Sequence, residues 1–323
     1  MGAPPLASEW LVLAICTIGF LAISKPIFTF VKWVWSNFLR PPKNLTTYGS
    51  WALVTGSTDG IGKALTFELA SKGLNLVLVG RNPQKLQSTS NEIRERFGEK
   101  TQIKIIVIDF EKISGEEIEE QIRRETEGLD VGVLVNNVGL SAKGARFFHE
   151  VDSESMDSLM NVNMGGVSWV TKAVLPGMLK KRKGAIVNIG SGASVAVPSY
   201  PLFTVYAATK AYVAMFSRSL GVEYKKHGID IQCQIPMLVA TKLASIRRSS
   251  FFVPSPKQYS NASIRWIGYE PLCVPYWTHA LEWCIMDALP ESLVDRLLFR
   301  YFCDLRKKIL KKESRNASLK QKS

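Results

Sequence analysis

Cysteine and histidine are scarce in this chain, which has five cysteines and three histidines among 323 residues. These residues are Cys16, Cys233, Cys273, Cys284, Cys303, His149, His227 and His279. No two cysteines have a CxxC or zinc-ligand spacing, and their odd number argues against a closed disulfide framework. The histidines are scattered and lack the clustering that a metal site requires. We therefore expect reduced thiols and no metal.

Acidic residues are also few, since 28 Asp and Glu stand against 41 Lys and Arg, for a net charge of +13. This charge favours anionic partners, namely phosphates, acidic lipid headgroups or nucleic acid. The sequence contains no nucleic-acid recognition motif, so we expect no nucleic-acid partner. Ten basic and two acidic residues lie in 296–323, which indicates a solvated basic tail or, beside a membrane, a contact with anionic headgroups.

Charge is absent from WLVLAICTIGFLAI, residues 10–23, and the apolar character resumes after Lys25 and Pro26. Together the two parts reach the roughly 20 residues that a membrane-spanning helix needs, with tryptophans near both ends. A cleaved signal peptide is the rival interpretation, but it requires positive charge before the apolar core, and here the charges follow it. We expect 1–43 to be an uncleaved anchor and linker, with the remaining chain in the cytosol.

The apolar fraction of 46% fits a globular protein with a sizeable core. After a Pro-rich linker at 40–50, short runs of Val, Ile and Leu alternate with longer amphipathic segments. Near-continuous apolar runs are typical of parallel strands buried on both faces. The pattern predicts an α/β protein with a doubly wound parallel sheet, the Rossmann fold. Strands are expected at 51–55, 74–80, 103–109, 131–137, 185–190 and 229–235, and no seventh can be placed beyond Gly268.

A glycine-rich stretch, TGSTDGIG at 55–62, follows the first expected strand and opens the first expected helix. In this context such a motif binds a dinucleotide. Gly56 permits a tight turn, Gly60 admits the pyrophosphate, and Gly62 lets helix and sheet pack closely. The alternative is a glycine-rich turn without a ligand. The other loop positions assigned to the cofactor are Thr55, Ser57, Asp59 and Ile61.

The end of the second expected strand, VLVGRN, carries Arg81 at the place where an acid would bind a ribose 2′-hydroxyl. A basic residue there favours a 2′-phosphate, so the sequence predicts NADPH rather than NADH. The alternative is a solvated charge at the end of a strand. Asp109, which ends the third strand, is placed to meet the adenine amino group, or else to cap a helix.

Several features in this order resemble the short-chain dehydrogenase/reductase family over about residues 48–241. They are the glycine loop, NNVG at 136–139, Asn163, a serine after the fifth strand, and Tyr206 with Lys210. The resemblance implies that Tyr206 protonates a substrate carbonyl while hydride leaves the nicotinamide. A free phenol has a pKa near ~10, and Lys210, one helical turn away, is expected to lower it and to hold the nicotinamide ribose.

The same resemblance assigns further site residues. The serine that orients the substrate oxygen is expected at Ser191, in NIGSG, with Ser194 as the alternative. Asn163 is expected to steady a proton-relay water, and Asn137 and Gly139 to lie along the cofactor.

The segment after the sixth strand departs from the family pattern. The family has Pro-Gly there, whereas this chain has Pro236 and Met237, followed by Thr241, which matches the threonine that holds the carboxamide. An aromatic-rich insertion at 242–277 is expected either to line an apolar acyl channel or to form an ordinary surface lid. The reductase domain as a whole is expected over 44–295.

The closer resemblance is to membrane-bound reductases of fatty-acid elongation, carried by GSGASVAVPSYPLFTVYAATK, VEYKKHGIDIQCQIP and YEPLCVPYW. It implies NADPH-dependent reduction of a very-long-chain 3-oxoacyl-CoA at the endoplasmic reticulum membrane, with other elongase subunits as partners. Two alternatives stay open. One is a steroid or other lipid carbonyl reductase with the same machinery, and the other is a non-catalytic paralogue.

Overall fold

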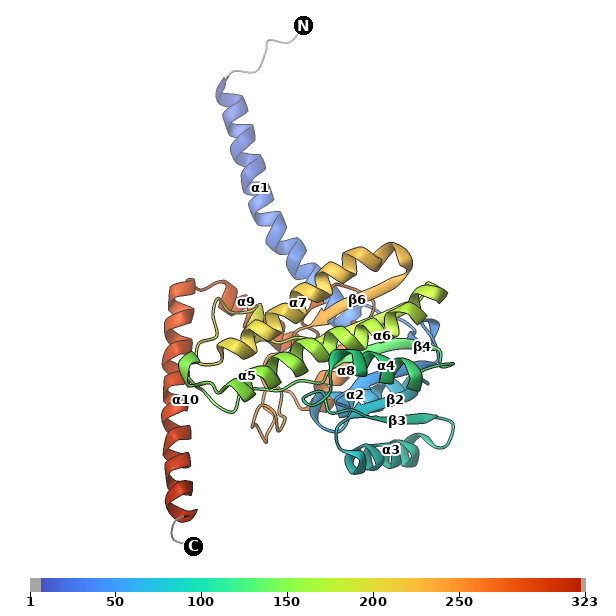
Figure 1. Ribbon diagram of the computed structural model, residues 1–323. Helices are drawn as coiled ribbons and strands as arrows, with labels where there is room; N and C mark the ends of the chain where they lie inside the picture. Colours follow the sequence, from blue (N-terminus) through green and yellow to red (C-terminus); the bar gives the residue numbers. More distant parts are fainter. Residues whose placement is uncertain (1–6, 321–323) are drawn as a thin grey trace. The chain divides into compact units, whose positions relative to one another are not determined.

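The computed structural model describes residues 7–320, with side chains for 9–314, and divides the chain into two units after Pro41. The first unit contains α1 (Ala7–Val34), which continues through Pro26, and the short π-helix η1 (Trp35–Leu39) (Figure 1). Among the described residues one helix, Glu9–Leu39, is long and apolar enough to cross a membrane. A signal sequence has the same character, so the uncleaved anchor stays a prediction.

The second unit, Pro42–Ser323, is built on a parallel sheet of order β3-β2-β1-β4-β5-β6-β7. This is the order of a doubly wound sheet, so the predicted Rossmann fold is confirmed. The strands are β1 (Trp51–Thr55), β2 (Asn75–Gly80), β3 (Ile103–Val107), β4 (Val131–Asn136), β5 (Gly184–Ile189), β6 (Ile229–Gln234) and β7 (Leu272–Cys273). The seventh strand has two residues, too few to show an apolar pattern in the sequence.

Helices cover both faces of the sheet (Figure 1). α2, α3 and α8 contribute to the core on one face, and α4, α6 and α7 to the core on the other. The helices are α2 (Gly60–Ser71), α3 (Pro83–Phe97), α4 (Gly115–Glu125), α5 (Ser153–Met160), α6 (Gly166–Lys181), α7 (Thr204–Tyr224), α8 (Pro256–Arg265), α9 (Trp277–Asp287) and α10 (Glu291–Lys320). Shorter turns are η2 (Leu45–Thr47), η3 (Phe148–Glu150), η4 (Asn161–Gly165), η5 (Gly192–Ser194) and η6 (Lys225–His227).

Side chains of the central strands alternate between the two cores. Leu53 of β1 belongs to the core under α4 and α6, while Ala52 and Val54 belong to the core under α2 and α3. All three are fully buried. A strand buried on both faces favours apolar side chains at successive positions, which is the physical reason for the near-continuous apolar runs.

Two segments differ from the expected tail and insertion. α10 is one continuous helix, so the expected boundary at residue 295 falls inside it, and its Phe302 is buried. The basic segment is therefore partly docked on the domain. In the insertion, Trp266 and Ile267 are buried and Ile267 belongs to the core, whereas Phe251 and Phe252 are exposed. Of these four residues, only Phe251 and Phe252 remain candidates for contact with an acyl chain.

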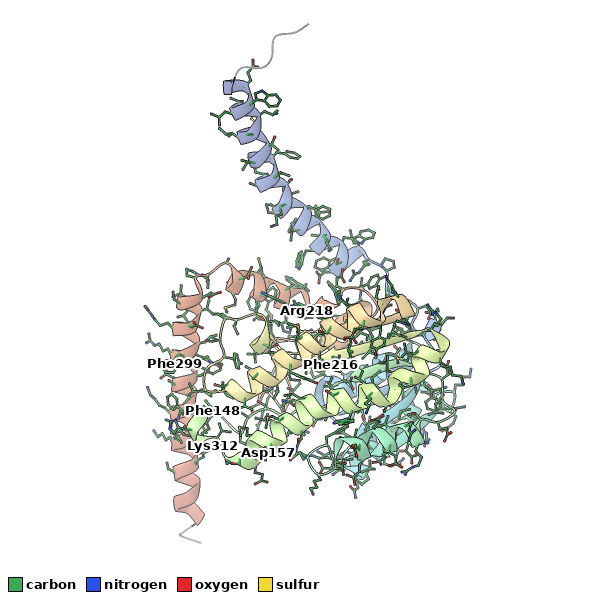
Figure 2. All side chains as sticks on the ribbon, turned by 45° about the horizontal axis from the view of Figure 1, so that its top comes forward. Phe148, Asp157, Phe216, Arg218, Phe299 and Lys312 are labelled. Carbon is green, nitrogen blue, oxygen red and sulfur yellow. The ribbon has the colours of Figure 1, made fainter. Side chains whose placement is uncertain are left out.

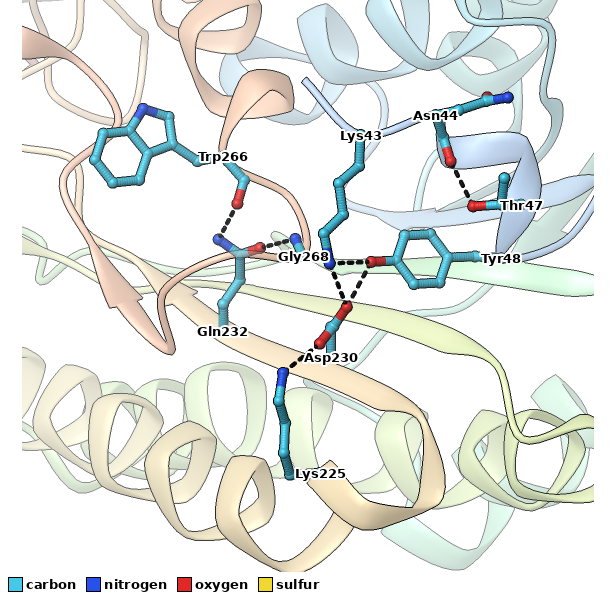
Figure 3. Close-up of polar contacts among 9 residues, drawn as sticks. All are labelled: Lys43, Asn44, Thr47, Tyr48, Lys225, Asp230, Gln232, Trp266 and Gly268. Carbon is cyan, nitrogen blue, oxygen red and sulfur yellow. Dashed lines mark hydrogen bonds and ion pairs between the residues drawn. The ribbon is translucent and has the colours of Figure 1, made fainter. Parts of the chain in front are cut away.

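A polar cluster ties the beginning of the second unit to the amino end of β6 (Figure 3). The Asp230 carboxylate accepts hydrogen bonds from the Tyr48 hydroxyl at 2.5 Å, and from the ammonium groups of Lys43 and Lys225 at 3.0 and 2.8 Å. A Cβ at Gly268 would lie 2.3 Å from the Tyr48 hydroxyl oxygen, so the cluster is closely covered. It lies at the edge of the sheet opposite the strand carboxyl ends, and we assign it a structural role.

Candidate active site

The carboxyl edge of the sheet gathers the residues singled out from the sequence. Because the strands are parallel, the segments that follow β1, β4, β5 and β6 reach one edge. They carry the glycine loop 55–62, the segment 137–139, Ser191 and Thr241, respectively. α7 reaches the same edge, since its Lys210 donates a hydrogen bond to the carbonyl of Ile189, the last residue of β5.

The glycine loop depends on residues without a side chain. Gly56 and Gly60 have φ of +65° and +54°, in the left-handed region that favours glycine. A Cβ at Gly62 would lie 2.2 Å from Asn137 Nδ2 and 2.3 Å from the Gly56 carbonyl oxygen. Asn137 Nδ2 in turn donates to the carbonyl oxygens of Thr55 and Gly56 at 3.1 and 3.2 Å. Position 62 therefore requires glycine, and the loop presents bare backbone at a helix N-terminus, as pyrophosphate binding needs.

The hydroxyl side chains of the loop join it to the neighbouring strands. Thr55 Oγ1 accepts hydrogen bonds from the backbone N–H groups of Asn137 and Val138, both at 3.0 Å. Ser57 Oγ donates to the Val79 carbonyl at 3.3 Å. Both side chains are fully buried. Their role in the structure is to hold the loop in place rather than to point toward a ligand.

Asp59 caps α2 and also anchors the segment after β6. Its Oδ1 accepts from the Gly60 N–H at 2.8 Å, and its Oδ2 pairs with Lys242 at 2.8 Å. A Cβ at Gly60 would lie 3.3 Å from the Thr241 methyl carbon, so Thr241 stands beside the glycine loop. Ile61 packs against the core under α2, and its carbonyl accepts from the Ser260 hydroxyl at 3.3 Å. No local pattern points to Lys242, because it is far from its partner in sequence.

Arg81 lies at the end of β2 and is paired with an acid. Its Nη1 donates to Glu111 Oε1 at 2.6 Å, and the two side chains are 62% and 30% exposed. Asp109 Oδ1 accepts from the Glu111 N–H at 3.3 Å, which fixes the turn after β3. The sequence predicts only the cation of Arg81 at this position. The structure adds the carboxylate of Glu111, from the turn after β3.

Tyr206 and Lys210 lie one turn apart on α7. Tyr206 is half-buried, and its phenol lies near the Ser191 hydroxyl, which opposes the effect of burial on the pKa of the phenol. Ser191 Oγ also accepts from the Ala193 N–H at 3.2 Å, whereas the Ser194 hydroxyl donates to the Ser191 carbonyl at 2.7 Å. Of the two serines considered from the sequence, Ser191 is the one that contacts the phenol.

Lys210 is buried, and its Nζ donates to the Ile189 carbonyl at 3.0 Å. Nζ also lies close to Gly139, where a Cβ would be 3.4 Å away. Burial lowers the pKa of Lys210 to about 8. The prediction that the pKa of Tyr206 is lowered is wrong for the protein alone, because burial raises that pKa and only the nearby Ser191 hydroxyl opposes the rise. Desolvation of the phenol is the larger effect.

Asn163 lies in η4 and links the segment after β4 to α7. Its Nδ2 donates to the Leu140 carbonyl and to Thr209 Oγ1, both at 3.0 Å, and its Oδ1 accepts from the Leu140 N–H at 2.7 Å. The side chain is fully buried. Because an amide oxygen has two lone pairs, one acceptor position on Oδ1 remains for the expected water. The π-helical turn is a form that often occurs at functional sites.

His279 on α9 is a site-supporting residue to which no sequence pattern points. Its ring is fully buried, with Nδ1 accepting from the Met237 N–H at 3.3 Å and Nε2 donating to the Leu238 carbonyl at 3.2 Å. Burial lowers the pKa of His279 to about 4, so the ring is neutral. The histidine fixes the backbone after Pro236, where the family glycine is missing.

Known proteins are similar to this chain in sequence and fold. The family model for short chain dehydrogenase matches residues 50–250. A very-long-chain 3-oxoacyl-CoA reductase-like protein of Arabidopsis thaliana is 48% identical over 295 residues, which cover 90% of this chain and 93% of that protein. The very-long-chain 3-oxoacyl-CoA reductase of Mus musculus is 39% identical over 319 residues, covering 97% and 99%.

A solved structure agrees as well. The short-chain dehydrogenase from Sphingobium yanoikuyae in complex with NADPH superimposes with a TM-score of 0.61 at 26% identity, over 76% of this chain and 94% of that one. The family match spans the glycine loop, Ser191 and the tyrosine–lysine pair, the same residues that the fold brings to one edge. By sequence and by architecture, the chain belongs to the short-chain dehydrogenase family.

Proposed function

We propose that this protein reduces a very-long-chain 3-oxoacyl-CoA to the 3-hydroxyacyl-CoA with NADPH, as a step of fatty-acid elongation. As a short-chain dehydrogenase it is an oxidoreductase of a family that uses nicotinamide cofactors. The observation that carries the proposal is the contact between the Ser191 hydroxyl and the Tyr206 phenol, on the edge that holds the glycine loop. The names of the plant and mouse relatives support this substrate.

The residues at this edge fit a nicotinamide dinucleotide. Gly56 and Gly60 present backbone without a Cβ to a pyrophosphate, and Gly139 leaves room beside Lys210 for a ribose. When bound, the dinucleotide supplies the hydride. Lys210 would then donate to the ribose hydroxyls, and Thr241, next to the glycine loop, would hold the carboxamide.

Tyr206 provides the proton. Ser191 donates a hydrogen bond to the substrate carbonyl oxygen and orients it. The Tyr206 phenol transfers its proton to the same oxygen as negative charge develops there. Because burial raises the pKa of the phenol, it stays protonated at neutral pH, as a donor for reduction must. Lys210, charged below its pKa of about 8, stabilises the phenolate that remains, and the water held by Asn163 returns a proton to it.

Arg81 supports NADPH over NADH. Its exposed guanidinium at the end of β2 is able to form charge-assisted hydrogen bonds with a 2′-phosphate. The guanidinium would exchange Glu111 for the phosphate, and an exposed ion pair of this kind contributes only about 0–1 kcal/mol. Asp109, in the adjoining turn, would meet the adenine amino group.

The exposed aromatic residues and the apolar helix support a lipid substrate at a membrane. Phe251 and Phe252 offer apolar surface in the segment after β6. We assign 1–43 to an anchor and linker in the endoplasmic reticulum membrane. The reductase domain, whose last helix α10 carries most of the basic residues of 296–323, then lies on the cytosolic side. At this membrane the protein would bind its long-chain acyl-CoA substrate and contact other elongase subunits.

Reduction of a steroid or another lipid ketone is the second candidate function, since Ser191, Tyr206 and Lys210 would serve the reduction of any apolar ketone. The test is oxidation of NADPH by the full chain in membranes, first with a long-chain 3-oxoacyl-CoA and then with a steroid ketone. We expect turnover of the acyl-CoA and a loss on the order of 10²–10⁴-fold in Tyr206→Phe. Tyr212→Phe is the control, because that hydroxyl contacts Ser168 at 2.8 Å on another face of α7.

The other outcomes separate the alternatives. Turnover of the steroid alone would favour the second candidate. Turnover of neither substrate, with NADPH still bound, would favour a non-catalytic paralogue.

A further inference from the structure

Tyr200 lies in the connection that leads into α7, and the mechanism above does not use it. Its ring packs edge-on against Phe302 of α10, with centroids 4.7 Å apart, and lies 5.8 Å from the ring of Phe203. The rings of Phe203 and Phe302 are themselves 5.1 Å apart. Three mutually packed rings restrict the rotamers of each other, so the direction of the Tyr200 phenol is set by α10.

The hydroxyl of Tyr200 is a donor near the first turn of α7, because its ring packs on Phe203, which caps α7 three residues before Tyr206. Within the part of the chain that the structure describes, no side chain or carbonyl forms a hydrogen bond with it. Burial raises the pKa of Tyr200 to about 12, and negative charge on the nearby Tyr206 and Tyr301 adds to the rise. The group is therefore protonated at neutral pH and has a proton to donate.

Contacts on both sides of Tyr200 hold this arrangement. The Ser199 hydroxyl donates to the Asp295 carboxylate at the start of α10. The buried Leu202 has a φ of +63°, and its carbonyl accepts from the Arg146 N–H at 3.0 Å. The connection before α7 is thereby tied both to α10 and to the segment after β4.

α10 is also bound directly to the segment after β4. Arg146 donates to both carboxylate oxygens of Glu313 at 2.6 and 2.7 Å, and Arg306 pairs with Glu150. Figure 2 shows Phe299 of α10 and Phe148 of η3 on the same side of the domain. The ring centroids of Phe147, the residue before Phe148, and Phe299 are 6.5 Å apart. The C-terminal helix thus joins two segments that border the active site.

The chemistry of a 3-oxoacyl thioester calls for a donor at this place. Its two carbonyl groups are separated by a single methylene, so when Ser191 and Tyr206 hold the 3-oxo oxygen, the thioester oxygen lies next to them. A buried carbonyl oxygen without a donor costs about 1–3 kcal/mol. An isolated ketone has no second oxygen and needs no second donor.

We propose that Tyr200 donates a hydrogen bond to the thioester carbonyl oxygen of the substrate, and that Phe302 of α10 holds it in position to do so. Tyr200 is then a specificity-determining residue that distinguishes a 3-oxoacyl thioester from an isolated ketone, and Phe302 is a positioning residue. This inference rests on the proposed function and names the group that recognises its substrate.

The test compares two substrates of equal chain length, a long-chain 3-oxoacyl-CoA and a methyl ketone. Tyr200→Phe keeps the ring and removes the hydroxyl, so we expect kcat/KM for the thioester to fall about ten-fold, as for one hydrogen bond, while that for the methyl ketone is unchanged. Phe302→Leu should lower kcat/KM for the thioester, relative to that for the methyl ketone, by a smaller factor. Tyr224→Phe, at the far end of α7, is the matched control. Binding of NADPH, followed by its fluorescence, should be equal in all variants.

Failure of the inference and failure of the proposed function give different results. In one outcome the wild type reduces the thioester, while Tyr200→Phe either lowers kcat/KM equally for both substrates or leaves both values unchanged. The inference is then wrong and the proposed function stands. If the wild type reduces only the methyl ketone, or neither substrate, both are wrong.

Discussion

At the scale of single residues, burial acts in opposite directions on Tyr206 and Lys210, the two groups to which we assign the proton transfer. It raises the pKa of the Tyr206 phenol and lowers the pKa of Lys210 to about 8. The first effect keeps a proton on the donor, and the second brings loss of the lysine's charge close to neutral pH. Activity should therefore depend on pH through Lys210 rather than through Tyr206.

We expect kcat/KM for reduction to be constant below neutral pH and to fall as the pH rises through about 8. Lys210 is charged below that pKa and neutral above it, whereas Tyr206 stays protonated over the whole range. Initial rates with saturating coenzyme, measured between pH 6 and 10, test this. Lys210→Arg, if it folds, should move the fall to higher pH. A profile that is flat through pH 8 would contradict the assignment.

Arg81 and Glu111 should have opposite effects on coenzyme choice. Arg81→Asp removes the cation and adds an acid that accepts a hydrogen bond from a 2′-hydroxyl, so preference should move from NADPH toward NADH. Glu111→Gln removes the carboxylate that competes with the 2′-phosphate, and the preference for NADPH should rise a few-fold. The ratio of kcat/KM for the two coenzymes measures both effects. An unchanged ratio in Arg81→Asp would refute the role given to Arg81.

At the scale of elements, the glycine loop and α2 form one unit with Asn137. A Cβ at Gly62 would lie 2.3 Å from the Gly56 carbonyl oxygen, which is backbone, and against the Asn137 amide, which two hydrogen bonds hold in place. The approach of α2 to β1 and β4 is therefore set by the absence of one side chain.

Gly62→Ala should weaken dinucleotide binding at least ten-fold, because the loop must shift away from its pyrophosphate-binding form. Titration of NADPH fluorescence measures this. Gly177→Ala is the control: nothing lies within 4 Å of a Cβ there, and alanine in a helix is more favourable than glycine by about 1 kcal/mol. Equal affinity of both variants would show that Gly62 is not needed for the loop geometry.

Also at this scale, the six predicted strands agree with the observed ones to within two residues at each end. Apolar runs between turn residues are local, so they can be read from the sequence. The two-residue β7 and the docking of α10 cannot be read in this way. β7 is defined by pairing with β6, and α10 by contacts such as Phe302 with Leu202.

At the scale of the whole molecule, the orientation of the reductase domain is open to a direct test. The sequence has sequons at Asn44, Asn261 and Asn316, and the first two side chains are exposed. The third lies outside the described side chains. If the domain faces the cytosol, none is glycosylated.

A shift in gel mobility after endoglycosidase treatment of the cell-expressed chain is the measurement. As a control, a secretory signal in place of residues 1–39 should send the domain to the lumen and produce glycans at Asn44 or Asn261. Glycans on the native chain would show that the orientation proposed from the charges after the apolar helix is wrong.

The sequence by itself determined the doubly wound sheet, the glycine loop at 55–62, and the separation of one helical turn between Tyr206 and Lys210. Each depends on neighbours in the chain: an apolar run, a strand–turn–helix order, or a separation of one helical turn. Spacing alone is enough for such features, because backbone geometry converts it directly into position.

Only the tertiary structure decided between Ser191 and Ser194, paired Arg81 with Glu111, and reversed the expected shift in the pKa of Tyr206. Each of these depends on which atoms meet across the fold and on how much water they lose. Local spacing carries neither quantity, since desolvation and long-range contacts exist only once the chain has folded.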